Sequence, residues 1–165
     1  MSEFDPERLL GTLVQHGVRF VVVGGFAAVA HGSPLPTYDV DVTPERTRSN
    51  LERLVLALTD LQARIRTEGE PQGLPFRADA DLLLGVTVLN LVTRLGELDL
   101  VLRPAGELDY DELASSAVHV VLGGVPVDLA SLEHVIRSKA AAGRAKDRAA
   151  LPVLRALQER QRPLS

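Results

Sequence analysis

The amino-acid sequence predicts an α/β (α+β) protein with a mixed β-sheet flanked by helices. Short apolar runs of strand length, such as Arg19–Val23, alternate with segments whose apolar residues recur at helical spacing, such as 131–142. The chain has 165 residues, of which 45% are apolar, which suits a domain with a hydrophobic core and excludes a disordered chain. We therefore expect a single domain over 1–165, with a core at about 18–128 and a C-terminal helical part at about 130–162.

Composition narrows the range of functions. The sequence contains no cysteine, which excludes disulfides and thiolate metal sites. It begins with polar and acidic residues, so we expect no secretory signal peptide. No apolar run approaches the roughly 20 residues that cross a bilayer, so we expect a cytoplasmic protein without a membrane partner. The net charge of −4 provides no general attraction for nucleic acid.

Local signals place the N-terminal elements. An Asp-Pro-Glu start signal at 5–7 predicts a helix, which Gly17 ends. The strand Arg19–Val23 is almost entirely apolar, as expected for a strand that is buried on both faces. A similar start signal, Thr-Pro-Glu at 43–45, predicts a second helix from about Pro44 to Leu61.

The middle of the chain is expected to be irregular. Residues 62–81 contain two glycines and two prolines, and we expect the longest loop here. Arg64, Arg66 and Arg77 on this loop could form a flexible lip over a substrate, or could be ordinary solvated side chains.

Further strands and a short helix complete the predicted fold. Strands at 86–93 and 98–102 flank a short glycine-containing connection, which is typical of a hairpin. Residues 118–122 and 125–129, joined by two glycines, indicate either a further hairpin or a bent strand. A short helix is expected at 109–117.

The strongest chemical signal lies at 21–42. We interpret it as a buried strand, a Gly24-Gly25 turn, an alanine-rich helix, and a second strand that carries Asp39 and Asp41. Strand residues i and i+2 share a face, so the two carboxylates point together and repel unless a cation lies between them. Mg²⁺ prefers such carboxylates together with substrate phosphates. The two glycines lack Cβ atoms and allow the backbone to approach a phosphate at the start of a helix.

Three further polar residues share elements with apolar residues. Asp99 lies in a strand, opposite its apolar face, so it is either a third carboxylate of the site or an ordinary exposed residue. Lys139 continues the apolar stripe of its helix, and Asp147 shares the apolar face of the last helix. Buried lysine is rare unless paired, so Lys139 and Asp147 indicate either an inward-facing polar site, an ion pair at the edge of the core, or a lysine that reaches water.

The order strand, Gly-Gly and Asp-x-Asp at 21–42 resembles the signature of the polymerase-beta-type nucleotidyltransferase superfamily. With His31-Gly32 and Thr37, it is similar to the small bacterial branch that includes the AbiEii-like and mycobacterial nucleotidyltransferase toxins of toxin–antitoxin systems. The string SKAAAGRAKD at 138–147 resembles the C-terminal block of the same branch. Tyr38 departs from the pattern, because many relatives have a basic residue there, which bears on substrate identity.

The resemblance implies a metal-dependent nucleotidyltransferase fold and enzyme, with C-terminal helices that complete the site. It implies Mg²⁺ as the cofactor and a nucleoside triphosphate as the substrate. The implied function is a toxin-type enzyme that modifies tRNA 3′ ends and has a cognate antitoxin. Alternatives are transfer to a small-molecule or protein hydroxyl, or a nucleotide-binding module without turnover. The implied site residues are, for catalysis, Asp39, Asp41, Lys139 and Asp147; for nucleotide binding, Gly24, Gly25, Ser33, Thr37 and Lys139; and for metal binding, Asp39, Asp41 and Asp99.

Overall fold

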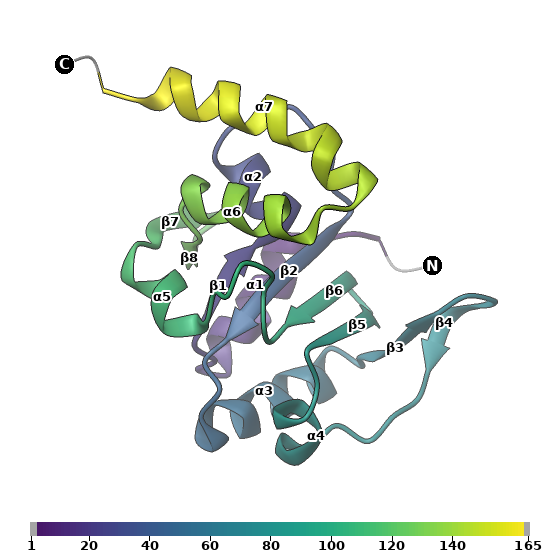
Figure 1. Cartoon of the computed structure of the whole chain (residues 1–165). Coiled ribbons are helices and arrows are strands. Elements are labelled where there is room, and N and C mark those ends of the chain that lie inside the picture. The colour runs from purple at the N-terminus through teal and green to yellow at the C-terminus, as the bar shows by residue number, and fades with distance from the viewer. Residues whose placement is uncertain (1–2, 164–165) are drawn as a thin grey trace.

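The computed structural model describes residues 3–163, which form one eight-stranded mixed β-sheet with flanking helices (Figure 1). In chain order the elements are α1 (Pro6–Gln15), β1 (Phe20–Val23), α2 (Gly24–Ala30), β2 (Asp39–Pro44), α3 (Arg48–Asp60), β3 (Arg64–Thr67), β4 (Glu70–Leu74), α4 (Ala80–Leu84), β5 (Val88–Thr93), β6 (Gly96–Val101), α5 (Tyr110–Ser115), β7 (Val118–Leu122), β8 (Val125–Leu129), α6 (Leu132–Ala142) and α7 (Ala145–Gln161). The predicted α+β class with a mixed sheet and flanking helices is confirmed.

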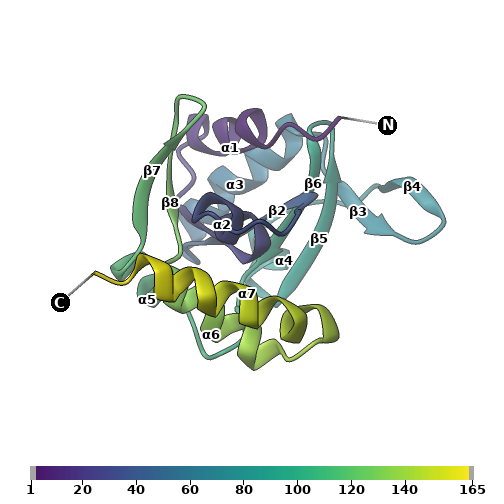
Figure 2. The ribbon, with the colours of Figure 1, turned by 90° about the horizontal axis from the view of Figure 1, so that it is seen from above.

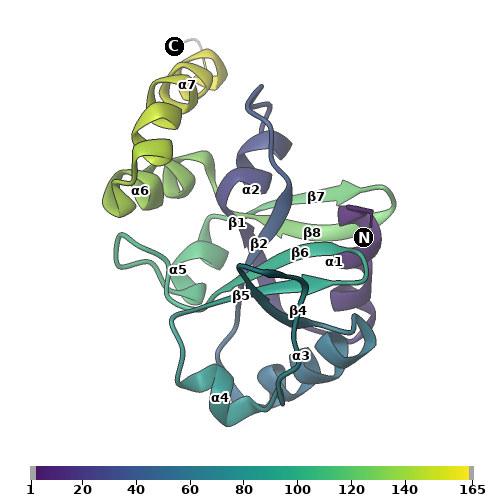
Figure 3. The same cartoon turned by 90° about the vertical axis from the view of Figure 1, so that its right-hand side faces the viewer.

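The strands follow the order β4-β3-β5-β6-β2-β1-β8-β7 across the sheet. β1 and β2 are antiparallel, whereas β2 and β6 are parallel neighbours. Helix α3 lies on the opposite side of the sheet from α6 and α7, and α2 packs against α6 (Figures 2 and 3). None of the helices within 3–163 is both long and apolar enough to cross a membrane.

Burial explains the first elements. All four residues of β1 are buried, as the apolar run predicts. In α1 the stripe Leu9, Leu10 and Leu13 is fully buried, and the side chain of Asp5 caps the helix by accepting the backbone N–H of Arg8. The sheet and α1 therefore share the core that the helical spacing predicts.

The predicted helix start at 43–45 is wrong. Thr43 and Pro44 end β2, and the buried Thr43 hydroxyl donates a hydrogen bond to the Val101 carbonyl at 2.8 Å. Helix α3 starts later, where the side chain of Thr47 accepts the backbone N–H of Asn50. Pairing with β1 and β6 outweighs the local Thr-Pro-Glu signal, because it satisfies the backbone groups of β2.

The predicted loop at 62–81 is also wrong, because most of it is ordered as the hairpin of β3 and β4, followed by α4. β3 pairs with β5, so the hairpin extends the sheet at one edge. Gly73 has φ +78°, and a Cβ there would lie 2.7 Å from the Ile65 carbonyl oxygen. The glycine that suggested irregularity therefore allows a close strand pairing with a register shift.

Candidate active site

Three carboxylates from two neighbouring strands meet on one face of the sheet. Asp39 and Asp41 project from β2, and Asp99 lies directly opposite Asp41 on the parallel strand β6. One carboxylate oxygen from each residue lies within 4.8 Å of the others. The intervening Val40 is fully buried, so alternation along β2 directs both aspartates away from that part of the core. We call Asp39, Asp41 and Asp99 the acid triad.

Gly24 provides the space that Asp41 occupies. It is the first residue of α2, so the expected glycine turn is instead the start of the helix. A Cβ on Gly24 would lie 2.0 Å from Oδ2 of Asp41, and φ at Gly24 is +67°. A Cβ on Gly25 would lie 3.3 Å from Oγ1 of Thr37. The two glycines therefore pack directly against residues of the site.

Replacing Gly24 with alanine should destabilise the protein by more than about 2 kcal/mol and displace Asp41. The left-handed backbone alone costs a non-glycine residue roughly 1–2 kcal/mol, and the clash with the carboxylate adds to this. The matched control is Gly69→Ala, because Gly69 has φ +84° and no atom within 4 Å of its Cβ position. Urea unfolding of both variants measures the difference, and equal losses would contradict the close approach.

The acid triad is electrostatically strained without a cation. Burial, with the charge of Asp39 beside it, raises the pKa of Asp41 from 3.8 to about 6. Burial, with the charge of Asp41, raises the pKa of Asp99 to about 8, although Arg66 opposes the rise. Oδ1 of Asp99 is buried, and it accepts no aligned hydrogen bond from any of the described residues. Three carboxylates with such an oxygen fit Mg²⁺, which binds carboxylate oxygens.

In the absence of divalent metal, the free energy of unfolding should fall as the pH rises through about 6 and about 8. Both groups have a raised pKa in the folded protein, so the folded state holds protons that the unfolded chain has released, and this stabilisation is lost as Asp41 and Asp99 ionise. Asp147, whose pKa is lowered, is ionised in both states across this range and does not contribute to the slope.

Unfolding at about pH 5 and about pH 9 measures the slope. Mg²⁺ should restore most of the loss, and Asp99→Asn should flatten the slope. If the free energy of unfolding of the metal-free protein rose between these two pH values, the carboxylates would not be electrostatically strained.

The acid triad lines a cleft of about 790 Å³. The same cleft is lined by three cations, which are Lys139 from α6, Arg144 just before α7, and Lys146 from α7. Further lining residues come from α2 with the loop after it and from β5 with β6, and include Gly24, Gly25, Ser33, Thr37, Tyr38, Val88 and Asn90. The structure therefore brings all of the predicted site residues to one cleft, with carboxylates facing cations.

Two hydroxyls support the loop between α2 and β2. The hydroxyl of Ser33 accepts the backbone N–H of Leu35 at 3.2 Å, and the Thr37 hydroxyl donates to the Asp39 carbonyl at 3.3 Å. The hydroxyl of Thr37 therefore bonds to the backbone of the residue that begins β2.

Asp147 lies among the cations and does not belong to the acid triad. It is fully buried, and its carboxylate accepts Nε of Arg144 at 2.7 Å and lies 3.7 Å from Nζ of Lys139. Burial alone would raise the pKa of Asp147, but the hydrogen bonds and charge of Arg144 lower it. The ion pair that the sequence left open is thus present, and it anchors two cations that line the cleft.

Sequence reasoning assigned Arg66 to a mobile loop and overlooked Glu97. In the structure Arg66 lies on β3, with Nη1 3.1 Å from Oε2 of Glu97 and Nη2 2.9 Å from Oδ1 of Asp99. Glu97 could have been found, because it is two residues before Asp99 on one strand face. Arg66 could not, since its contact depends on a hairpin that the glycines and prolines obscured.

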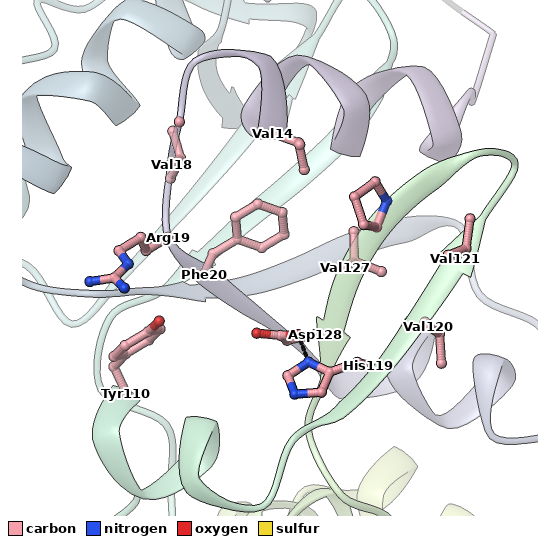
Figure 4. Close-up of a pocket in the computed structure, with 12 residues that line it drawn as sticks. Val14, Val18, Arg19, Phe20, Tyr110, His119, Val120, Val121, Val127 and Asp128 are labelled. Carbon is pink, nitrogen blue, oxygen red and sulfur yellow. Dashed lines mark hydrogen bonds and ion pairs between the residues drawn. The ribbon is translucent and has the colours of Figure 1, made fainter.

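A second hollow of about 540 Å³ lies between α1, α5 and the strands β1, β8 and β7 (Figure 4). It shares no lining residue with the acid cleft. Its charged groups are already paired, His119 with Asp128 and Arg19 with Glu45, and Phe20 points into it.

Comparison with known proteins gives matches among solved structures. No protein-family model matches the sequence, and no curated protein matches it. The antibiotic-resistance factor ANT(2″)-Ia is 18% identical, with 92% of this chain and 83% of that chain covered and a TM-score of 0.56. The lincosamide antibiotic adenylyltransferase LnuA, bound to lincomycin, is 12% identical over 95% and 99% of the two chains, with a TM-score of 0.60. A proposed nucleotidyltransferase from Thermotoga maritima is 15% identical over 96% and 97%, with a TM-score of 0.55.

These likenesses establish the class of fold. The mixed sheet with flanking helices is that of the nucleotidyltransferases, over nearly the whole chain. The fold that the sequence resemblance implied is therefore confirmed.

Proposed function

We propose that this protein transfers a nucleotide from a nucleoside triphosphate to an acceptor hydroxyl, with Mg²⁺ held by Asp39, Asp41 and Asp99. The observation that carries the proposal is the acid triad, in which one oxygen from each carboxylate lies within 4.8 Å of the others in a cleft that cationic side chains also line. When bound, Mg²⁺ would neutralise phosphate charge and lower the pKa of the acceptor hydroxyl.

Two groups of residues in the cleft would bind the triphosphate. Lys139, Arg144 and Lys146 face the triphosphate and offset the charge that develops on the leaving pyrophosphate. Asp147 holds Lys139 and Arg144 in place. Gly24, Gly25, Ser33 and Thr37 line the wall against which the phosphates lie.

The reaction is a displacement at the α-phosphorus. The acceptor oxygen forms a bond to this phosphorus, and the bond to the bridging oxygen of the pyrophosphate breaks. Pyrophosphate leaves with the electron pair, and the hydroxyl proton passes to solvent. The product carries the nucleoside monophosphate on the acceptor oxygen.

We place the acceptor among small hydroxylated molecules. Two arginines that could have bound an RNA backbone are engaged within the chain. Arg64 donates to the Gly73 carbonyl at 3.1 Å, and Arg137 pairs with Glu112 at 2.9 Å. One structural neighbour was solved with adenylyl-2″-tobramycin and another with lincomycin, which are small molecules.

The second candidate is transfer to tRNA 3′ ends by a toxin-type enzyme that an antitoxin restrains, as the sequence resemblance implies. Two exposed cations that line the cleft, Arg103 and Lys146, favour it. If they contact phosphates together with other cations, tRNA affinity should fall roughly a hundredfold or more between about 50 and about 200 mM salt.

Incubation with α-labelled nucleoside triphosphates and Mg²⁺ tests both candidates. One arm contains a pool of hydroxylated antibiotics and metabolites, and the other contains total tRNA. We expect label in the small-molecule pool. Label in tRNA would instead support the second candidate. Mg²⁺-dependent triphosphate binding without labelled product in either arm would indicate a binding module without turnover and contradict the proposal.

A further inference from the structure

Arg66 reaches the acid triad from a strand that does not adjoin it. β3 pairs with β5, and β5 pairs with β6, where Asn90 lies opposite Asp99. The Arg66 side chain therefore extends past β5 to reach Glu97 and Asp99 on β6. The hairpin of β3 and β4 is thus linked to Asp99 of the acid triad by an ion pair.

One guanidinium holds two carboxylates. Nη1 of Arg66 lies 3.1 Å from Glu97 and Nη2 lies 2.9 Å from Asp99. The planar fork suits this arrangement, because its donors diverge at fixed angles. The Asp99 side chain is only 13% exposed, so water screens the contact weakly. Glu97 is the second anchor that keeps the fork in place.

We propose that Arg66 is a positioning residue that holds the Asp99 carboxylate where the acid triad binds a cation. Oδ1 of Asp99 accepts no aligned hydrogen bond among the described residues, so the guanidinium charge is what faces this oxygen. Asp99 lines the cleft and Arg66 is not among its described lining residues, so the effect of Arg66 on a bound cation runs through Asp99. The inference rests on the proposed function, because it concerns the same metal site.

Two possible roles for Arg66 predict opposite changes in Mg²⁺ affinity when its side chain is removed. A cation that merely stood near the acid triad would repel Mg²⁺, so its removal would tighten Mg²⁺ binding. A residue that orients a ligand lowers metal affinity when it is lost, commonly by roughly 10–100-fold. Binding of Mg²⁺ alone, without nucleotide or turnover, therefore separates the two roles.

The experiment measures Mg²⁺ affinity by calorimetry and by its effect on the Tm. Arg66→Met should bind Mg²⁺ roughly 10–100-fold more weakly. Arg66→Lys keeps the charge but loses the fork, so its affinity should be intermediate. The matched control is Arg64→Met on the same strand, since within residues 3–163 the Arg64 guanidinium donates to the Gly73 carbonyl and to no carboxylate. This control should keep wild-type Mg²⁺ affinity even if its Tm falls.

A double-mutant cycle tests whether Arg66 acts through Asp99. In an Asp99→Asn background, Arg66→Met should change kcat and Mg²⁺ affinity less than about twofold, because coupled residues are not additive. Unchanged or tighter Mg²⁺ binding in Arg66→Met, or losses that multiply in the double mutant, would overturn the inference. If the wild-type protein itself bound no Mg²⁺ and transferred no nucleotide, the proposed function would fail first.

Discussion

Asp41→Asn should abolish nucleotidyl transfer while raising the stability of the metal-free protein. A metal ligand of this kind supplies several kcal/mol of transition-state stabilisation, and about 4 kcal/mol is roughly a thousandfold in rate. Stability should rise because Asp41 is partly buried beside the charge of Asp39, so its ionised form is unfavourable without a cation. The asparagine keeps the shape that fits against Gly24.

Turnover in saturating Mg²⁺ and the metal-free Tm should be measured on the same preparation. The matched control is Asp81→Asn, which makes the same chemical change at a side chain that is 78% exposed and pairs with Arg48. It should leave turnover unchanged. Near-normal turnover of Asp41→Asn would make the metal assignment wrong, and an unfolded variant would make Asp41 a structural residue.

Lys139→Met should reduce kcat by roughly 30-fold to 1000-fold, which corresponds to about 2–4 kcal/mol for one electrostatic stabiliser. The Lys139 side chain is 18% exposed, and Lys139 lies one helical turn after the buried Val135 of α6. The fold should tolerate the change, because Arg144 still pairs with the buried Asp147.

Kinetics and thermal unfolding of this one variant separate the two interpretations of Lys139. A lysine that serves only the ion pair with Asp147 would leave kcat unchanged and the Tm equal or higher. Arg137→Met is the control on the same helix, since Arg137 pairs with Glu112 at 2.9 Å. Its turnover should match that of the wild-type protein.

The elements near the acid triad were the most predictable part of the chain. Local sequence patterns predict three of these features, which are the strand β1, the shared face of Asp39 and Asp41, and the hairpin of β5 and β6. The alternation of side chains along a strand predicted that Asp99, like Asp41, lies opposite the apolar face of its strand. That these strands are parallel neighbours with Asp41 opposite Asp99 is a long-range pairing, which periodicity does not encode.

Two errors have one physical cause, which is that tertiary pairing overrides local signals. The Thr-Pro-Glu motif resembles a helix start, but the buried Thr43 gains a hydrogen bond to the Val101 carbonyl in the sheet. Glycines and prolines at 62–81 favour a loop, but Gly73 allows the tight pairing of β3 and β4. The position of Arg66 beside Asp99 followed the second error, because it depends on that hairpin.

The most direct test of metal-dependent nucleotidyl transfer compares two labels on one nucleoside triphosphate. The protein is incubated with Mg²⁺, an acceptor pool, and a triphosphate labelled at either the α-phosphate or the γ-phosphate. The proposed reaction places the α-label on the acceptor and the γ-label in free pyrophosphate, and both signals disappear in Asp41→Asn. Transfer of the γ-label to the acceptor, or transfer of the α-label that survives removal of Mg²⁺ or the loss of Asp41, would contradict it.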